Sequence, residues 1–155
     1  MAGYGLEVAQ RSALERPTAA TQIYVADTLG ELGLFYRLAR VSFIGGSLVR
    51  HGGQNPIEPV RLGTAVLHGP HVGNFADIYG ALNAAGGAAS VTDVQDLADR
   101  AGRLLRDPLA LEQQTKAGLA ALEPFSGALE RSLSAMKPFL DRLRLVRDTK
   151  GEETT

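Results

Sequence analysis

The sequence contains no cysteine, which excludes disulfide bonds and thiolate metal sites. It has three histidines, His51, His68 and His71, so a zinc site built from several histidines is not expected. Sixteen basic residues against seventeen acidic ones give a net charge of -1, and such a balance supplies no overall field that would attract nucleic acid. No apolar run reaches the roughly 18 to 20 residues that a membrane-spanning helix needs.

Three common catalytic or nucleotide-binding fingerprints are also absent. The sequence has no GxxxxGK[ST] phosphate loop and no GxSxG nucleophile elbow. Gly3 and Gly5 lack a third glycine in register and follow no strand pattern, so a dinucleotide-binding fingerprint fails. A small nucleotide-sugar epimerase or dehydrogenase is therefore disfavoured.

Glycine, in contrast, is abundant: 18 of the 155 residues are glycine, well above the usual share of about 7%. Hydrophobic residues make up 45% and charged residues 21%, a balance typical of a globular protein. A chain of this length can bury roughly 70% of its unfolded surface, which is enough for one core. The glycines cluster, and the main cluster coincides with the strongest candidate site.

Short apolar runs and helical patterns alternate along the chain. The runs predict strands at 22–26, 41–44, 65–67 and 88–91. Helical spacing of apolar residues predicts helices at 29–39, from 56, at 75–82 and at 94–105. This rhythm is typical of βαβ units with right-handed crossovers, so we expect an α/β, Rossmann-like fold with a parallel sheet.

The same patterns divide the chain into four regions. Residues 1–21 are expected to form a short helix at most and then a loop. Residues 22–106 are expected to form a Rossmann-like nucleotide-binding region. Residues 107–148 read as helices, and the polar tail 149–155 is expected to fray. The last helix is predicted from an apolar stripe of Leu129, Leu133, Met136, Leu140 and Leu143.

Three polar or glycine-containing loops follow predicted strands, at 27–31, 45–59 and 68–74. Ligands of open parallel sheets bind beyond the carboxyl ends of the strands. We therefore expect these three loops to meet on the same rim of the sheet.

The loop 45–59 is a candidate anion site. Glycines such as Gly46 let the backbone approach a ligand closely and expose its amides. Asn55 is a favoured N-cap and Pro56 a favoured first helical residue, so a helix start with unpaired amides is predicted there, suited to phosphate. Ser47 and Asn55 supply further donors, and Glu58 in the first turn suits a ribose diol.

Plainer interpretations compete with each of these. The loop would also serve as a surface turn, with Glu58 complementing the helix dipole. At the first strand–helix junction, the backbone of Leu29 and Gly30 is placed to contact the edge of a base, but Thr28 and Glu31 also have the spacing of a capping box. Each histidine is suited to bind an anion or simply to face solvent. The basic stretch 131–150 suits an anionic membrane surface or a solvated helix face.

Read together, the motifs resemble one family. The segments DTLGEL, FIGGSL, GGQNPIEP and GPHVGNF, in this order between Tyr24 and Asp93, are similar to the carboxyl-terminal domain of the bacterial 3-deoxy-D-manno-octulosonic acid (Kdo) transferases of lipopolysaccharide synthesis. The likeness continues more loosely to Leu140. Gln54 stands where the family usually has histidine, and Val72-Gly73 replaces a Thr-Phe or similar pair.

This resemblance implies the carboxyl-terminal half of a GT-B glycosyltransferase that moves Kdo, with inversion, from CMP-Kdo to a lipid A precursor. It implies no cofactor and no established need for a metal. The family's CMP contacts map onto residues in two segments, namely Leu29, Gly30, Glu31, Asn55, Pro56, Ile57 and Glu58.

The resemblance also implies what lies outside this sequence. The family's amino-terminal half carries the membrane anchor, the acceptor site and the carboxylate base that inverting transfer requires. We therefore expect the chain to be a fragment that holds the donor site, is inactive alone, and acts at the cytoplasmic face of the inner membrane in its parent enzyme. The alternative is a non-catalytic remnant or partner subunit that docks on a separate amino-terminal domain.

Overall fold

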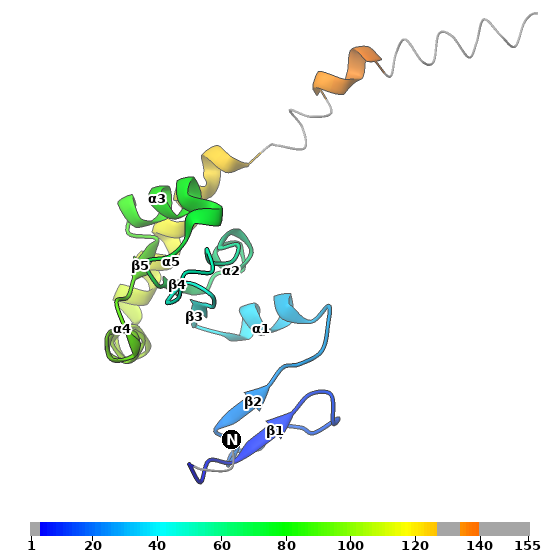
Figure 1. Cartoon of the computed structure of the whole chain (residues 1–155), viewed down its shortest axis with the longest axis vertical. Helices are drawn as coiled ribbons and strands as arrows, with labels where there is room; N and C mark the ends of the chain where they lie inside the picture. Colours follow the sequence, from blue (N-terminus) through cyan, green and yellow to red (C-terminus); the bar gives the residue numbers. More distant parts are fainter. Residues whose placement is uncertain (1–3, 127–133, 140–155) are drawn as a thin grey trace, which may run out of the picture. The chain divides into compact units, whose positions relative to one another are not determined.

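The structure is a computed structural model that describes residues 4–126 and 134–139. Its strands are β1 (Val8–Gln10), β2 (Ile23–Val25), β3 (Val41–Ile44), β4 (Ala65–His68) and β5 (Ala88–Ser90) (Figure 1). Its α-helices are α1 (Leu32–Leu38), α2 (Ile57–Arg61), α3 (Ala76–Ala84), α4 (Val94–Arg106) and α5 (Pro108–Leu122). Two 3₁₀ turns lie at Gly73–Phe75 and Glu123–Phe125.

The chain falls into two compact units, Met1–Ala121 and Leu122–Thr155. The described part of the second unit holds the turn Glu123–Phe125 and a helical segment at 134–139. Met136 of the predicted apolar stripe lies in that segment, whereas the other four stripe residues and the tail 149–155 lie outside the described residues. The four-region division made from the sequence remains a prediction.

All strands of the first unit pair in parallel, but they form two sheets. Strand β1 pairs with β2, with Val8 opposite Ile23, and the second sheet has the order β3-β4-β5. The α/β class with parallel strand pairing is confirmed, and the described strands are divided between two sheets. The segment 1–21 was expected to form a short helix at most and then a loop, but it contains the strand β1. Only the central residue of β1, Ala9, is buried, so the segment has no apolar run that would predict a strand.

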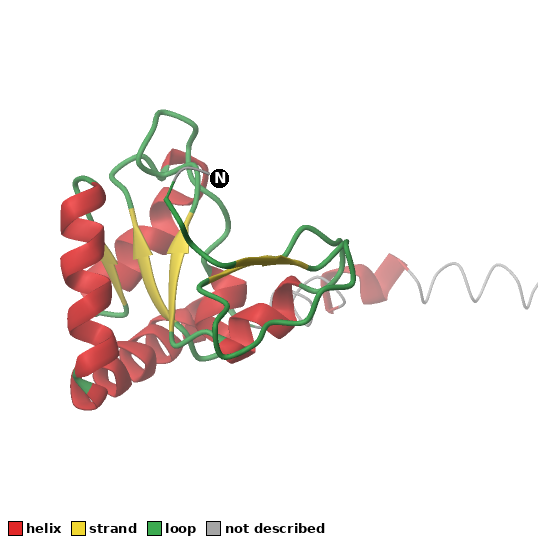
Figure 2. Ribbon diagram, turned by 90° about the horizontal axis from the view of Figure 1, so that it is seen from below, coloured by secondary structure: helices red, strands yellow, loops and turns green. Residues whose placement is uncertain are grey.

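The three-stranded sheet is covered by helices on both faces, and all four residues of its central strand β4 are buried (Figure 2). On one face Leu67 packs with Leu104 of α4, and Leu111 of α5 joins the same cluster. On the other face the ring of His68 lies 4.4 Å from that of Tyr79 of α3. A strand buried on both faces reads as a continuous apolar run, which is why the sequence predicts β4 well.

The sequence predicts Thr92 or Asp93 as the cap of the helix at 94–105, and Asn74 as the cap of the helix at 75–82. Asp93 caps α4 as expected, because its side chain accepts a hydrogen bond from the Asp96 amide at 2.9 Å. Asn74 does not cap α3: the residue before that helix is Phe75, and the Asn74 side-chain amide donates instead to the carbonyl of Gly53 at 3.3 Å. Asn74 thus joins two loops at the rim of the sheet.

Candidate functional site

The glycine-rich loop that follows β3 is folded back on itself. Gly46, Gly52 and Gly53 all have positive φ angles, of 68°, 97° and 70°, which a residue with a Cβ adopts only with strain. The Gly53 amide donates to the Gly46 carbonyl at 3.1 Å and closes the loop. The glycine cluster seen in the sequence is therefore required by the backbone path.

Ser47 joins this loop to the loop after β4. Its side chain is fully buried, donates a hydrogen bond to the carbonyl of Ile44 and accepts one from the Gly69 amide at 2.8 Å. The His71 amide also donates to the Ser47 carbonyl at 2.9 Å. Since the hydroxyl is already engaged and inaccessible, the structure gives Ser47 a supporting position rather than one facing a ligand.

A Ser47→Ala variant tests this supporting role. Removing the hydroxyl leaves the buried Gly69 amide without its acceptor, so we expect a loss of about 1 to 3 kcal/mol in the free energy of unfolding, measured by urea titration. Ser90→Ala, at an exposed serine of the same sheet, should change stability by less than about 0.5 kcal/mol. Equal stability of Ser47→Ala and the unmodified chain would contradict the assignment.

The loops after β3 and β4 meet at further points. The Asn74 amide donates to the Gly52 carbonyl at 3.1 Å, and the Tyr79 hydroxyl donates to the Gln54 carbonyl at 2.8 Å. These contacts confirm that two of the three predicted loops share one rim. They also fix the path of the chain just before Asn55, two residues ahead of the first residue of α2, Ile57.

Next to this rim lies an open cavity of about 340 Å³. It is lined by residues of α1, of the loop before α2 and of α2 itself: Gly33, Arg37, Asn55, Ile57, Glu58, Arg61 and Leu62. Three predicted site residues, Asn55, Ile57 and Glu58, are thus brought together at one cavity, and Pro56 is buried beneath them.

The Glu58 side chain lies over Gly33 of α1, which has no side chain of its own. A Cβ placed on Gly33 would lie 3.3 Å from Oε1 of Glu58 and 4.0 Å from Nη1 of Arg37. Burial, and secondly the negative charge of Glu58, raise the pKa of the neighbouring Tyr36 hydroxyl. The cavity therefore presents one exposed carboxylate and arginine side chains close to Gly33.

The helix start provides fewer unengaged amides than the sequence suggested. Helix α2 begins at Ile57, one residue later than expected, and the Ile57 amide donates to Oδ1 of Asn55 at 2.9 Å. The Gly53 amide is engaged with Gly46. Phosphate binding at this helix start remains a prediction. The structure gives more direct support to the Glu58 carboxylate as a contact for a ligand, because that residue is exposed at the cavity.

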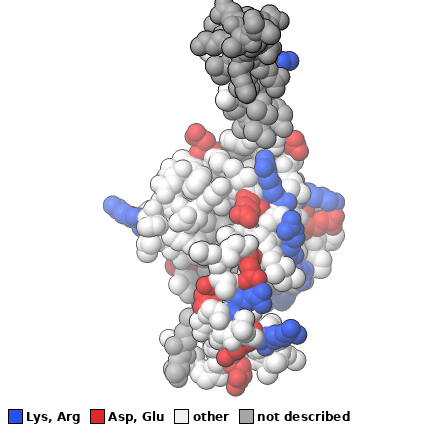
Figure 3. Space-filling model, turned by 90° about the vertical axis from the view of Figure 1, so that its right-hand side faces the viewer, with Lys and Arg blue, Asp and Glu red and all other residues white. Residues whose placement is uncertain are grey.

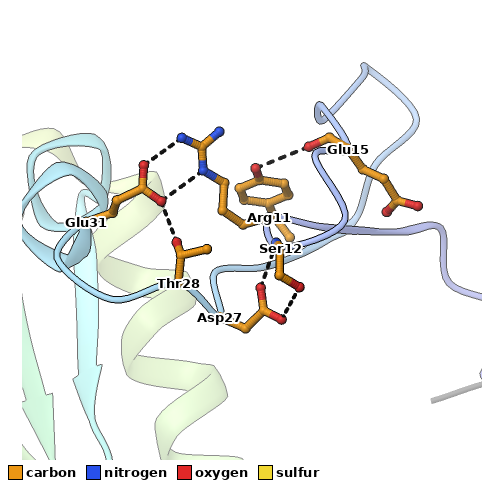
Figure 4. A network of polar contacts seen from close by, with 7 residues as sticks. Arg11, Ser12, Glu15, Asp27, Thr28 and Glu31 are labelled. Carbon is orange, nitrogen blue, oxygen red and sulfur yellow. Dashed lines mark hydrogen bonds and ion pairs between the residues drawn. The ribbon is translucent and has the colours of Figure 1, made fainter.

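The segment Leu29–Glu31 does not line this cavity. Leu29 is fully exposed, with a relative exposure of 101%, and Gly30 has a φ of 83° in the turn before α1. Glu31 directs its carboxylate to Arg11, with Oε2 2.9 Å from Nε and Oε1 2.6 Å from Nη2 (Figure 4). The structure thus places Glu31 against Arg11, the residue that follows β1, and none of these three predicted base and ribose contacts at the cavity.

The expected capping box at Thr28 and Glu31 is not formed. The Thr28 hydroxyl donates to the Glu31 carboxylate rather than accepting from a backbone amide, and the residue before α1 is Glu31 itself, without a side-chain cap. The Arg11 guanidinium competes for the same carboxylate in a bidentate pair, which is the stronger type of hydrogen bond. Sequence spacing alone does not show Arg11 as a partner.

A second carboxylate, Asp27, is held in the same region (Figure 4). It accepts hydrogen bonds from the Ser12 amide at 2.9 Å, the Ser12 hydroxyl at 2.7 Å and the Gln10 side chain at 2.6 Å. The Ser12 hydroxyl, followed by Gln10, lowers the pKa of Asp27 to about 2. Hydrogen bonds from Arg11, followed by Thr28, lower the pKa of Glu31 to about 2.

These pKa values predict a pH-dependent contribution to stability. A carboxyl whose pKa is lower in the folded chain stabilises it fully above the unfolded value, which for Glu31 is about 4.5, and loses this effect as the pH falls towards 2. We expect Glu31→Gln to reduce the free energy of unfolding at pH 7, with the difference from the unmodified chain shrinking between about pH 4.5 and 2. A difference that is constant over this range would contradict the ion pair.

The histidines occupy different surroundings. His68 is buried, with Nδ1 2.7 Å from the Gly69 carbonyl and Nε2 3.0 Å from Oδ1 of Asn83, so it has a structural role. His51 is exposed and covers Gly46. Within the described ranges, no group of three or more histidine or acidic side chains is arranged to hold a metal. On the face drawn in Figure 3, acidic side chains lie beside basic ones, so that face carries no broad patch of one sign.

Gly33 and Arg37 line the cavity but were not predicted from the sequence as site residues. Their four-residue spacing places them on one side of α1, and the contact of α1 with α2 brings them to Glu58. The available signal was a glycine within an otherwise helical segment, which often marks a close approach.

Comparisons with known proteins bear on this site. No protein-family model matches the chain. It is 39% identical over 134 residues to the 3-deoxy-D-manno-octulosonic acid transferase of Haemophilus influenzae and 38% identical over 137 residues to that of Bordetella pertussis. These matches cover 86% and 88% of this chain but 31% and 32% of the two relatives, so the chain spans about a third of their length.

A solved structure matches as well. The crystal structure of the C-terminal CMP-Kdo binding domain of WaaA from Acinetobacter baumannii superposes with a TM-score of 0.74 at 34% sequence identity. The match covers 76% of this chain and 62% of that domain. The resemblance inferred from the motifs, and the α/β fold that it implied, are confirmed.

Proposed function

We propose that this chain is the donor-binding part of a Kdo transferase and binds CMP-Kdo at the cavity between α1 and α2. Its similarity to Kdo transferases and to a CMP-Kdo binding domain supports the choice of ligand. The observation that carries the proposal is the exposed Glu58 carboxylate over Gly33 at that cavity. A carboxylate so placed can accept two hydrogen bonds from the hydroxyls of a ribose.

The other groups at the cavity suit the rest of a nucleotide. Arg37 lines the same cavity as Glu58, and its guanidinium can bind phosphate or the carboxylate of the sugar. Gly46, Ser47 and Pro56 hold the loop, while Asn55 and Ile57 present the start of α2 to the cavity.

The transfer reaction itself requires more than this chain shows. In the proposed parent enzyme, Kdo passes from CMP-Kdo to a hydroxyl of a lipid A precursor, and a base removes the proton of that hydroxyl as it attacks. We assign the base and the acceptor site to residues outside this sequence. We place the parent enzyme at the cytoplasmic face of the inner membrane, with which it associates peripherally. In the part of the chain that is described, no helix is long and apolar enough to cross a bilayer.

Calorimetric titration with CMP tests the proposal. We expect saturable binding, and weaker binding of AMP, whose larger base must fit the same cavity. No heat at millimolar CMP would contradict donor binding by this chain.

The alternative function, a non-catalytic partner subunit, is favoured by one separate observation. The two sheets of the first unit leave outer strands that pair with no other strand among the described residues. Such edges are prone to association with a further chain. Size-exclusion chromatography of the chain alone distinguishes the cases, because an obligate subunit is not expected to run as a clean monomer.

A further inference from the structure

Tyr79 joins the core of the first unit to the loop that precedes α2. Its side chain is buried, and the centre of its ring lies 4.4 Å from that of His68, the last residue of β4. The His68 ring is itself fixed, because its two nitrogens lie 2.7 Å from the Gly69 carbonyl and 3.0 Å from Oδ1 of Asn83. Tyr79 therefore packs on a fixed base, and its hydroxyl reaches the loop.

The Tyr79 hydroxyl determines how one peptide group of that loop is turned. It donates a hydrogen bond to the Gln54 carbonyl at 2.8 Å. Among the described residues no peptide bond is cis, and in a planar trans peptide the carbonyl and the amide of the next residue point in opposite directions. The Asn55 amide therefore points away from Tyr79 and from the core behind it.

The Asn55 amide is an unused hydrogen-bond donor at the cavity between α1 and α2. No residue within 4–126 and 134–139 accepts a hydrogen bond from it, whereas the Ile57 amide is engaged with Oδ1 of Asn55. Pro56 has no amide hydrogen. Asn55 is exposed and lines the cavity. A backbone amide in such a position suits an anionic group of a ligand, to which it can make a charge-assisted hydrogen bond.

We infer that Tyr79 is a positioning residue of the donor site: by holding the Gln54 carbonyl, its hydroxyl turns the Asn55 amide towards the phosphate of the bound nucleotide. The inference rests on the proposed function, because it requires CMP to occupy the α1–α2 cavity. Tyr79 does not itself line that cavity. Burial, and secondly the negative charge of an ionised Tyr36, raise the pKa of the Tyr79 hydroxyl, so this group remains a donor at neutral pH.

A purely structural role of Tyr79 gives a different expectation. If the hydroxyl only supported the loop, its removal would loosen the whole wall of the cavity and weaken the binding of every ligand. If it orients the Asn55 amide, its removal weakens only a ligand with an anionic group at that amide. CMP and cytidine distinguish the two roles, because they share base and ribose and only CMP carries a phosphate.

Calorimetric titration of Tyr79→Phe with CMP and with cytidine tests the inference on the full chain. Phenylalanine keeps the ring against His68 and removes only the hydroxyl. We expect CMP affinity to fall at least about fivefold, because a hydrogen bond to a charged group is weakened, and cytidine affinity to stay within about twofold. Tyr24→Phe is the matched control: the Tyr24 hydroxyl also donates to a backbone carbonyl, that of Glu15 at 3.3 Å, but Tyr24 does not line the cavity. It should bind both ligands like the unmodified chain.

The NMR signal of the Asn55 amide gives a second measurement, which needs no variant and decides if Tyr79→Phe does not fold. Its proton should shift downfield with CMP and stay in place with cytidine. Unchanged CMP affinity in Tyr79→Phe, an equal loss for CMP and cytidine, or an Asn55 signal that CMP leaves in place would overturn the inference while the donor site stands. If the unmodified chain binds neither ligand, the proposed function fails, and the inference fails with it.

Discussion

A Gly69→Ala variant should lose most of the stability of the first unit and, with it, the candidate site. A Cβ on Gly69 would lie 2.2 Å from the Ser47 carbonyl oxygen and 2.5 Å from the Leu48 amide nitrogen, and both are backbone atoms that a rotamer change cannot move. The two loops must then separate. We expect a loss of about 3 kcal/mol or more, which is a large part of the stability of a typical domain.

The matched control for this variant is Gly73→Ala in the same loop region. A Cβ on Gly73 has no heavy atom within 4 Å, and Gly73 does not have a positive φ. Its stability should stay within about 0.5 kcal/mol of the unmodified chain. Thermal and urea unfolding measure both variants. If both alanines were tolerated equally, the close approach of the two loops would be wrong.

The second large effect is expected at Glu58. Replacing Glu58 by alanine removes the carboxylate that we propose as the acceptor for the ribose hydroxyls. A hydrogen bond to a charged group contributes about 1.5 to 3 kcal/mol, so CMP affinity should fall about ten- to a hundredfold. Stability should change little, because the Glu58 side chain is exposed.

Asp77→Ala is the control for Glu58→Ala. Asp77 is an exposed acidic residue in the first turn of α3, as Glu58 is in the first turn of α2, but it does not line the cavity. It should bind CMP like the unmodified chain. An equal loss of affinity in both variants would mean that overall charge, and not the Glu58 carboxylate, determines binding.

The parts of the fold that sequence predicted best are those with a strong local signal. Strand β4 is a continuous apolar run, and Asp93 stands directly before an amphipathic helix, so both were predicted from neighbours in the chain. Strand β1 was not predicted, because one buried residue in three leaves no pattern. The division into two sheets also could not be predicted, since strand partners are set by contacts far apart in sequence.

In the candidate site, too, residues with a local sequence signal were predicted, whereas residues placed by long-range contacts were not. The glycine-rich loop, Asn55 and Glu58 were found because their residue types have local meanings, namely backbone freedom, capping and acidity. Glu31 was expected near the nucleotide but pairs with Arg11, twenty positions away, and Arg37 reaches the cavity only through the packing of α1 on α2. Long-range ion pairs and helix packing are tertiary properties that spacing does not encode.

The most direct test of the proposed donor site is to follow CMP binding residue by residue in the isotope-labelled chain by NMR. Addition of CMP should shift the amide signals of Gly33, Arg37, Asn55, Ile57 and Glu58 in one saturable process, and Glu58→Ala should weaken it. If instead no signals move, or the shifts centre on residues remote from the α1–α2 cavity such as Ala85, Arg103 and Gln113, CMP does not bind where we propose.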